Sequence, residues 1–377
     1  MKLAGLTWWR NNYGSILQAY ALQKELNSYS GIEYEIINQY GKKIISIDNL
    51  IDKLRTFGLF KTFQRIFWKF AVPPLKKRSD KLQRFVDEKL ILSEKQYNES
   101  TIVQTNQLYD GFICGSDQIW NPMLTPMDSM YWLTFAADSK IKIAYAPSIG
   151  VEKLSENEKI ILRKNLSRFE AISCREIDGS NLINDVIGTK FCANVVDPTL
   201  LVEKYVWDDL CTSRKIVEPY VFVYLLRGTK KQRKDVEKFA RENKLKIVTM
   251  PFLETEHTVF YDFMFGHVKL WYVSPEEFVS TIKYADCVIT DSFHSTVFSC
   301  IYHVPFIIFP KEGNSQMSRI LNLLNLLGIE SRIVENYTSL VEMNLKKIDW
   351  NKSDRRIYEE RNKSRNYLTR ALKNLEK

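Results

Sequence analysis

The sequence has few of the residues that build metal sites and disulfide frameworks. It holds four histidines and six cysteines in 377 residues, and none of them forms a C-x-x-C, H-x-x-x-H or H-E-x-x-H pattern. A zinc site therefore has little support. The cysteines lie in apolar contexts, which favours buried free thiols over disulfides. No D-x-D follows a predicted strand. We therefore expect no bound metal and no resident cofactor.

Long apolar runs are also absent. No stretch approaches the roughly 18–20 uninterrupted apolar residues that a membrane-spanning helix needs, and runs such as VPFIIF (304–309) have the length of buried strands. The first residues, MKLAGLTWWRNNYGS, do not have the pattern of a signal peptide. We therefore expect a cytoplasmic protein.

The length and the apolar pattern predict two domains. A chain of 377 residues is too long for one ordinary core and suits two domains of roughly 150–200 residues. Short apolar runs are each followed by a turn and then by a helical pattern, which is typical of parallel strands joined by crossover helices. The sequence predicts an α/β protein with two Rossmann-like, doubly wound domains that face a cleft. Their expected ranges are 1–205 and 216–350, followed by a C-terminal helix (351–377) that packs back across the domains.

Helix starts are marked at several places along the chain. Ser155 with Glu158, and Ser274 with Glu277, have the spacing of a capping box, in which each side chain bonds the other residue's backbone N–H. We expect a helix to begin after each of these serines.

The net charge of +9 is concentrated in one stretch. Lys and Arg alternate with Phe and Trp over residues 54–85, inside a basic, aromatic region (48–95) that we expect to be helical. This region can be an amphipathic helix with a solvated basic face, or it can contact an anionic membrane surface. The sequence contains no recognisable nucleic-acid-binding module, so we do not expect a nucleic-acid partner.

The segment VITDSFHST is the first candidate site. A predicted strand (286–290) ends in Asp291, Ser292 and His294, and a helix is expected to begin at about Ser295. Ligands of open α/β sheets bind at the carboxyl ends of the strands, and the N-terminus of a helix favours an anion. A histidine there can bind an anion or transfer a proton. Alternatively, Asp291 and Ser292 only cap the helix and His294 packs in the core.

The segment DGFICGSDQIWNP is the second. An apolar strand (111–114) leads into Gly115, Ser116, Asp117 and then Trp120. The carboxylate of Asp117 could take a proton from a hydroxyl, and Trp120 could stack on a sugar ring. Alternatively, Asp117 caps a helix and Trp120 belongs to the core.

Cationic residues follow two further strands. Arg175 ends the predicted strand AISC, where a guanidinium would suit a carboxylate or a phosphate; the alternative is a salt bridge with Glu176. Lys311 and Arg319 follow the strand PFIIF. In addition, WWRNNYGS places Asn12, Tyr13 and Gly14 before a helix, as in an anion or sugar cradle, although it lacks the spacing of a dinucleotide-binding fingerprint.

Taken in order, several segments resemble the polysaccharide pyruvyl transferase family. They run from about residue 4 to 328: WWRNNYGSILQAYALQ, DGFICGSDQIWNP, KIAYAPSIG, SCRE, DPTLL, SPEEFVSTIKYADCVITDSFHSTVFS and NSQMSRI. The resemblance implies two Rossmann-like domains similar to those of GT-B-type glycosyltransferases. It also implies transfer of a pyruvyl group from phosphoenolpyruvate to a sugar of a cell-surface polysaccharide precursor, such as capsule or exopolysaccharide. The product would be a pyruvate ketal, usually across the 4- and 6-hydroxyls, with release of phosphate.

The resemblance also implies roles for particular residues. Arg175, His294 and Lys311 match positions that would surround the phosphate and carboxylate of phosphoenolpyruvate, and Asp117 matches an acid that would face the acceptor sugar. Asp291 and Ser295 stand where members often carry Asn and Gly. We expect catalysis from His294, Asp117 and Arg175. The expected substrate-binding residues are Lys311, Ser292, Asp291, Arg319, Asn12, Tyr13, Gly14, Ser116 and Trp120.

Two other functions share these features. A GT-B-type glycosyltransferase that uses a nucleotide sugar would have the same fold and an anion site, and a non-catalytic sugar-phosphate binding protein would have the same cleft. The expected acceptor is a lipid-linked glycan intermediate, which would bring the protein to the inner face of the cell membrane.

Overall fold

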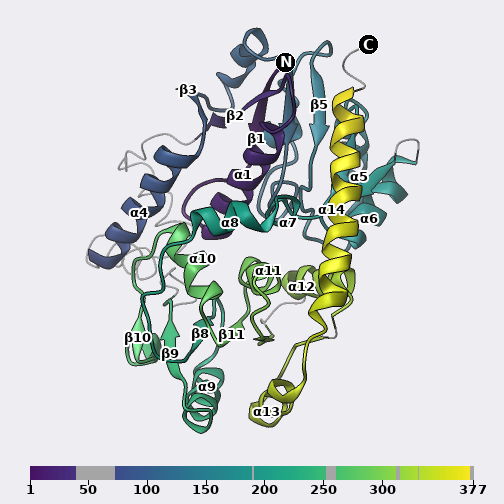
Figure 1. Ribbon diagram of the computed structural model, residues 1–377. Helices are drawn as coiled ribbons and strands as arrows, with labels where there is room; N and C mark the ends of the chain where they lie inside the picture. The colour runs from purple at the N-terminus through teal and green to yellow at the C-terminus, as the bar shows by residue number, and fades with distance from the viewer. Residues whose placement is uncertain (40–72, 189–190, 252–259, 311–314, 330, 374–377) are drawn as a thin grey trace, which may run out of the picture.

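The computed structural model of the protein describes residues 1–39, 73–188, 191–251, 260–310, 315–329 and 331–373. Within these ranges the chain forms two five-stranded sheets, with strand orders β3-β2-β1-β4-β5 and β10-β9-β8-β11-β12. Every pair of neighbouring strands in them is parallel. This arrangement confirms the predicted α/β class with two Rossmann-like domains (Figure 1).

The first domain is built on the sheet that contains β1. Its strands are β1 (Lys2–Leu6), β2 (Glu33–Asn38), β3 (Leu92–Gln96), β4 (Gly111–Cys114) and β5 (Ile141–Ala144), with the pair β6 (Ile172–Cys174) and β7 (Cys192–Asn194) beyond β5. The helices are α1 (Tyr13–Leu26), α4 (Pro73–Lys89), α5 (Glu156–Leu166), α6 (Ile177–Ile187), α7 (Pro198–Leu201) and α8 (Lys204–Leu210), and the 3₁₀ helices are η1 (Ile102–Gln107) and η2 (Met130–Trp132). All residues of β4 are buried, as expected for a parallel strand covered on both faces.

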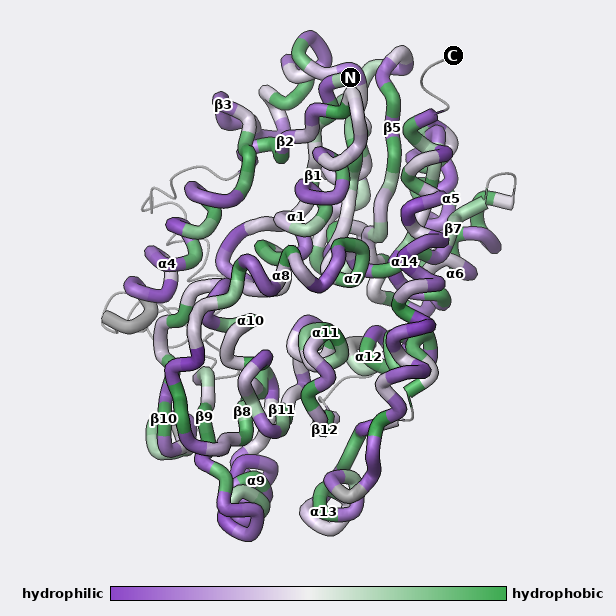
Figure 2. Tube along the Cα trace, viewed as in Figure 1, coloured by the Kyte–Doolittle hydropathy of each residue, from purple (hydrophilic) through white to green (hydrophobic). Residues whose placement is uncertain are grey.

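The second domain repeats this plan. Its strands are β8 (Tyr220–Tyr224), β9 (Lys246–Thr249), β10 (Val268–Lys269), β11 (Cys287–Thr290) and β12 (Phe306–Ile308). The helices are α9 (Lys230–Glu242), α10 (Pro275–Lys283), α11 (Phe293–Ile301), α12 (Ser315–Leu327) and α13 (Tyr337–Leu345), with the 3₁₀ helix η3 (Phe260–Phe263). Figure 2 shows hydrophobic residues along strands such as β5 and β8 and hydrophilic residues on the outer helix α9.

One continuous apolar cluster joins the two domains. The Tyr13 ring of α1 stacks on Phe278 of α10 with their centres 5.0 Å apart, and Trp207 of α8 meets Phe298 of α11 edge-on at 4.9 Å. Because these aromatic side chains are buried, they hold α1 and α8 of the first domain against α10 and α11 of the second.

The helix α14 (Trp350–Lys373) begins on the second domain and runs along the first (Figure 1). The ring of His303 stacks on Trp350 near its start. Farther along, the Tyr367 hydroxyl donates to the Ala144 carbonyl at 2.7 Å, and Ser364 accepts a hydrogen bond from the Val196 amide. The helix thus ties the carboxyl ends of β5 and β7 to the second domain.

The basic, aromatic region is only partly described. Its residues 48–72 lie outside the described ranges. The prediction that it stays helical to residue 95 is wrong, because α4 ends at Lys89 and Leu92–Gln96 forms β3, whose Ser93 hydroxyl accepts a hydrogen bond from the Asn38 amide of β2. Among the described helices, none has the length and apolarity to cross a membrane.

Replacing Tyr367 by Phe tests the attachment of α14. The change removes one partly buried hydrogen bond to the Ala144 carbonyl, which keeps its bond from the Ser173 hydroxyl. We expect the free energy of unfolding to fall by about 0.5–1.5 kcal/mol, measured by urea denaturation. Tyr358→Phe is the matched control, because Tyr358 is exposed on the same helix. Equal stability of both variants would contradict this role of Tyr367.

Candidate active site

A buried ion pair forms the centre of the candidate site. Arg175 follows β6, and Asp197 caps α7, where its Oδ1 accepts hydrogen bonds from the backbone N–H and the hydroxyl of Thr199. The Arg175 Nη1 donates to Asp197 Oδ2 at 2.7 Å, and its Nε donates to Glu176 Oε1 at 3.0 Å. The side chains of Arg175 and Asp197 are 3% and 1% exposed, so solvent does not screen the pair.

His294 brings a second basic group to Asp197 from the other domain. It is the second residue of α11, whose N-cap Ser292 accepts a hydrogen bond from the Ser295 amide. The His294 Nε2 lies 3.7 Å from Asp197 Oδ2, too far for a hydrogen bond, and it has no hydrogen-bond partner. The other face of the ring contacts α1: a Cβ added to Gly14 would lie only 1.9 Å from His294 Nδ1. Glycine at position 14 therefore makes room for the imidazole.

The neighbouring charges decide the ionisation of Asp197. Burial alone would raise the pKa of its carboxyl, but His294 and Arg175 outweigh burial, so that the pKa lies well below its usual range. Although burial lowers the pKa of Arg175, the carboxylates of Glu176, Asp197 and Asp117 raise it above its ordinary value. Both groups are therefore ionised at neutral pH.

Asp117 adds a further carboxylate to the charged groups near Arg175. Its backbone has φ +67°, in the left-handed region. Its carboxylate accepts hydrogen bonds from the Ser15 hydroxyl and, at 2.9 Å, from the Gln118 amide. The preceding Ser116 donates to Asp197 Oδ2 at 3.4 Å. The structure thus brings Asp117, Ser116, Arg175 and His294 around one buried network.

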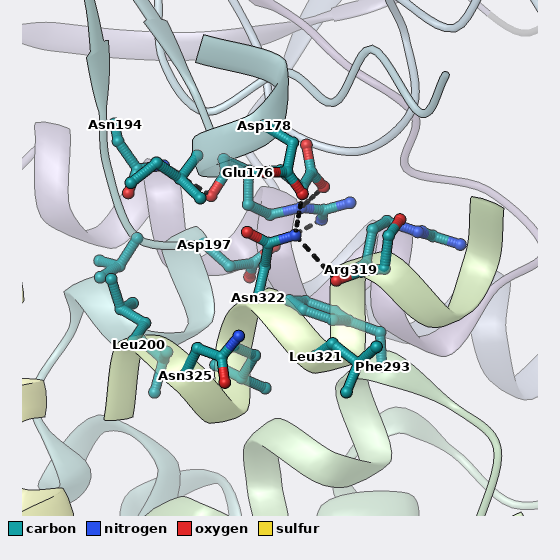
Figure 3. Close-up of a pocket in the computed structure, with 16 residues that line it drawn as sticks. Glu176, Asp178, Asn194, Asp197, Leu200, Phe293, Arg319, Leu321, Asn322 and Asn325 are labelled. Atoms are coloured by element: carbon teal, nitrogen blue, oxygen red, sulfur yellow. Dashed lines mark hydrogen bonds and ion pairs between the residues drawn. The ribbon is translucent and has the colours of Figure 1, made fainter. Parts of the chain in front are cut away.

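A cavity of about 490 Å³ opens beside this network, between the two domains (Figure 3). Arg175 and Asp197 line it from the first domain, and Arg319 of α12 lines it from the second. The Arg175 Nη2 and the Arg319 Nε have no hydrogen-bond partner. Burial and the positive charge of Arg175 lower the pKa of Arg319, and nearby carboxylates offset this in part. Both nitrogens are buried, and their side chains form part of the cavity wall, so this wall contains two guanidinium donors that no protein group uses.

The family model described as polysaccharide pyruvyl transferase matches residues 12–310, which include Asp117, Arg175, Asp197 and His294. The chain belongs to this family. A member of the family is a transferase that acts on polysaccharide, so the buried network and its cavity are the candidate active site. None of the curated proteins compared with the chain matches it.

Solved structures share the fold. The chain is similar to the UDP-N-acetylglucosamine 2-epimerase from Rickettsia bellii, with a TM-score of 0.56, 9% identity and coverage of 100% of this chain and 97% of that one. It is also similar to a putative UDP-N-acetylglucosamine 2-epimerase from Listeria monocytogenes, with a TM-score of 0.52, 8% identity and coverage of 95% and 90%. At such low identity the likeness shows the fold alone, which is the predicted GT-B-type architecture.

Several residues that were predicted to bind substrate form hydrogen bonds with backbone groups of the protein. Asn12 caps α1, where its side chain accepts from the Gly14 amide at 2.8 Å. The Tyr13 hydroxyl donates to the Val273 carbonyl of the second domain. Asp291 accepts hydrogen bonds from the amides of Leu226 and Arg227 at 2.7 and 2.8 Å, and so fixes the loop after β8. The structure therefore places these three side chains in structural roles, and Ser292 acts as the helix cap.

Trp120 requires a correction. Its side chain is fully buried, its ring stacks on Trp132 with their centres 4.8 Å apart, and its Nε1 donates to the Tyr131 carbonyl. No face of the ring is open to a sugar, because the core encloses it. Lys311 lies outside the described residues.

Three residues at the site are not among those predicted from the sequence: Asp197 joins both domains at the network, and Asp178 and Asn322 line the cavity. Glu176 forms the salt bridge with Arg175 that was the alternative prediction for this arginine. A signal for Asp197 was present, since Asp-Pro-Thr after a strand is typical of a helix start at a strand's carboxyl end. No local pattern indicates Asp178 or Asn322.

A double-mutant cycle tests the contact between Gly14 and His294. Gly14→Ala alone should lower the free energy of unfolding by about 1–3 kcal/mol, because the added methyl group overlaps the imidazole. In a His294→Ala background the ring is absent, and the same change should cost less than about 0.5 kcal/mol. Urea denaturation of the four proteins measures both values. Equal costs in the two backgrounds would show that the ring does not occupy this space.

Proposed function

We propose that the protein transfers a pyruvyl group from phosphoenolpyruvate to a sugar of a cell-surface polysaccharide precursor. The product is a pyruvate ketal, 4,6-linked in this proposal, and phosphate is released. The observation that carries the proposal is the pair of unpartnered guanidinium donors, Arg175 Nη2 and Arg319 Nε, at one interdomain cavity. Membership of the polysaccharide pyruvyl transferase family supports the choice of a pyruvyl group as the group that is transferred.

The donor's chemistry fits these residues. Phosphoenolpyruvate carries a phosphate and a carboxylate, and guanidinium groups bind both with paired hydrogen bonds. Donors in a buried site are strong because little water competes with them. Arg175 is already held by Asp197 and Glu176, so its free N–H is fixed before the substrate arrives. In this proposal Lys311 adds a third positive charge, and no metal or resident cofactor takes part.

The proposed reaction moves one proton to carbon and two away from oxygen. His294, beside the carboxylate of Asp197, gives its proton to the methylene carbon of the donor, which becomes a methyl group. A sugar hydroxyl then forms a C–O bond to the cationic carbon and loses its proton. Asp117 is the proposed base. Phosphate leaves with the electrons of its C–O bond, and a second hydroxyl closes the ketal and passes its proton to the departing phosphate.

Incubation with phosphoenolpyruvate and a methyl galactoside tests this reaction. We expect phosphate release together with a product that is heavier by one pyruvyl ketal in mass spectrometry. His294→Ala should lower kcat by about 10²–10⁴-fold, because it removes the acid. His303→Ala is the control, since His303 is exposed and pairs with Asp354 away from the network.

Three outcomes would contradict the proposal. They are the absence of turnover with any hexoside, a loss below about tenfold in a folded His294→Ala protein, and tight binding of a nucleotide sugar with no binding of phosphoenolpyruvate. The last outcome would favour a GT-B-type glycosyltransferase.

The acceptor is proposed to be lipid-linked, so that the protein works at the inner face of the membrane. The exposed Lys76 and Lys77 of α4 would contact anionic headgroups there. Flotation with liposomes should then require anionic lipid, weaken as salt rises, and decrease in the Lys76→Glu, Lys77→Glu double variant. Binding that is independent of salt, or absent, would contradict the membrane contact.

A further inference from the structure

A hydrogen bond between the two domains crosses the cavity beside the candidate active site. Asn322 of α12 donates from Nδ2 to Asp178 Oδ2 of α6 at 2.7 Å, and also to the Ser318 carbonyl at 2.9 Å (Figure 3). Both side chains line the cavity, and the bond between them is exposed to solvent. A hydrogen bond in such a place contributes only about 0.5–1.5 kcal/mol, so a ligand can replace it at small cost.

The two groups are suited to hydroxyls. A sugar hydroxyl both donates and accepts, a carboxylate only accepts, and a carboxamide does both. Two neighbouring hydroxyls could therefore donate to Asp178 and accept from Asn322 in place of the present bond. Asn325, three residues farther along α12, also lines the cavity and is exposed, so it extends the row of amides.

Each of these polar residues has an exposed apolar neighbour. Ile177 precedes Asp178 and is 52% exposed, and Leu321 precedes Asn322 and is 36% exposed. Both line the cavity, one from each domain. Apolar side chains beside hydroxyl-binding groups match a pyranose, whose ring carries C–H groups between its hydroxyls. The cavity wall thus has the mixed character of a carbohydrate site.

The same helix carries the cationic end of the cavity. Arg319 precedes Asn322 by three residues on α12, and residues at this spacing have Cβ atoms about 5–6 Å apart. A ring held by Asn322 through one pair of hydroxyls would therefore lie beside the cavity wall that Arg175 and Arg319 also form.

We infer that Asp178 and Asn322 form the acceptor subsite and bind two hydroxyls of a hexopyranoside. This inference rests on the proposed function. The two hydroxyls that react then face the donor at the arginines, and Ile177 and Leu321 cover the ring. The interdomain hydrogen bond marks the position of this subsite.

Steady-state kinetics with phosphoenolpyruvate and a methyl galactoside test the subsite. Asp178→Ala and Asn322→Ala should each raise the KM for the galactoside by about 10–100-fold and leave the KM for phosphoenolpyruvate unchanged. Asn322→Asp, which keeps the size of the side chain but places a second negative charge opposite Asp178, should raise the galactoside KM as well. Asp185→Ala is the matched control, because Asp185 is exposed on α6 two turns beyond Asp178 and does not line the cavity.

Saturation-transfer NMR with the methyl galactoside alone separates this inference from the proposed function. A galactoside signal that is lost in Asp178→Ala and Asn322→Ala but kept in Asp185→Ala supports the subsite, even if the wild-type protein consumes no phosphoenolpyruvate. An unchanged signal, or an unchanged galactoside KM with a lower melting temperature only, would overturn it. The bond would then be a structural link between the domains.

Discussion

The buried negative charge of Asp197 is the constraint on which the site depends. A carboxylate without solvent needs compensation from several sides, and it receives Arg175 and Thr199 from the first domain and His294 from the second. Because these groups come from both domains, they fix the separation of the domains at this point. Gly14 follows from the same constraint, since only a residue without a side chain lets the imidazole approach α1.

The compensation also bears on the proposal that an anion binds in a cavity beside so many acids. Glu176, Asp197 and Asp117 balance the charge of Arg175, yet they use only two directions of its guanidinium. In the proposal, binding of an anion then depends on which guanidinium N–H groups lack a partner, rather than on the net charge around the cavity. Arg319 adds the second such group from a helix of the other domain, so that an anion bound there contacts both halves of the molecule.

Local patterns in the sequence were enough to predict the fold. Apolar runs such as that of β4 became buried parallel strands, and the capping boxes at Ser155 and Ser274 are present. The position of Arg175 and His294 at strand ends also placed both near the cleft. The partners of polar groups were not predictable, because the amides that engage Asp291 follow a strand far away in the chain. Trp120 was misjudged for a similar reason, since its stacking partner Trp132 lies in the short 3₁₀ helix η2, which no local pattern predicted.

The course of α14 has a consequence for the order in which the protein assembles. The surface of the first domain that this helix covers includes Ala144, Val196 and Leu200, and it is complete long before α14 emerges during synthesis. The whole second domain is made in between. That surface therefore stays open on the ribosome until nearly all of the described chain is translated, and a chaperone or a premature partner has access to it during this interval.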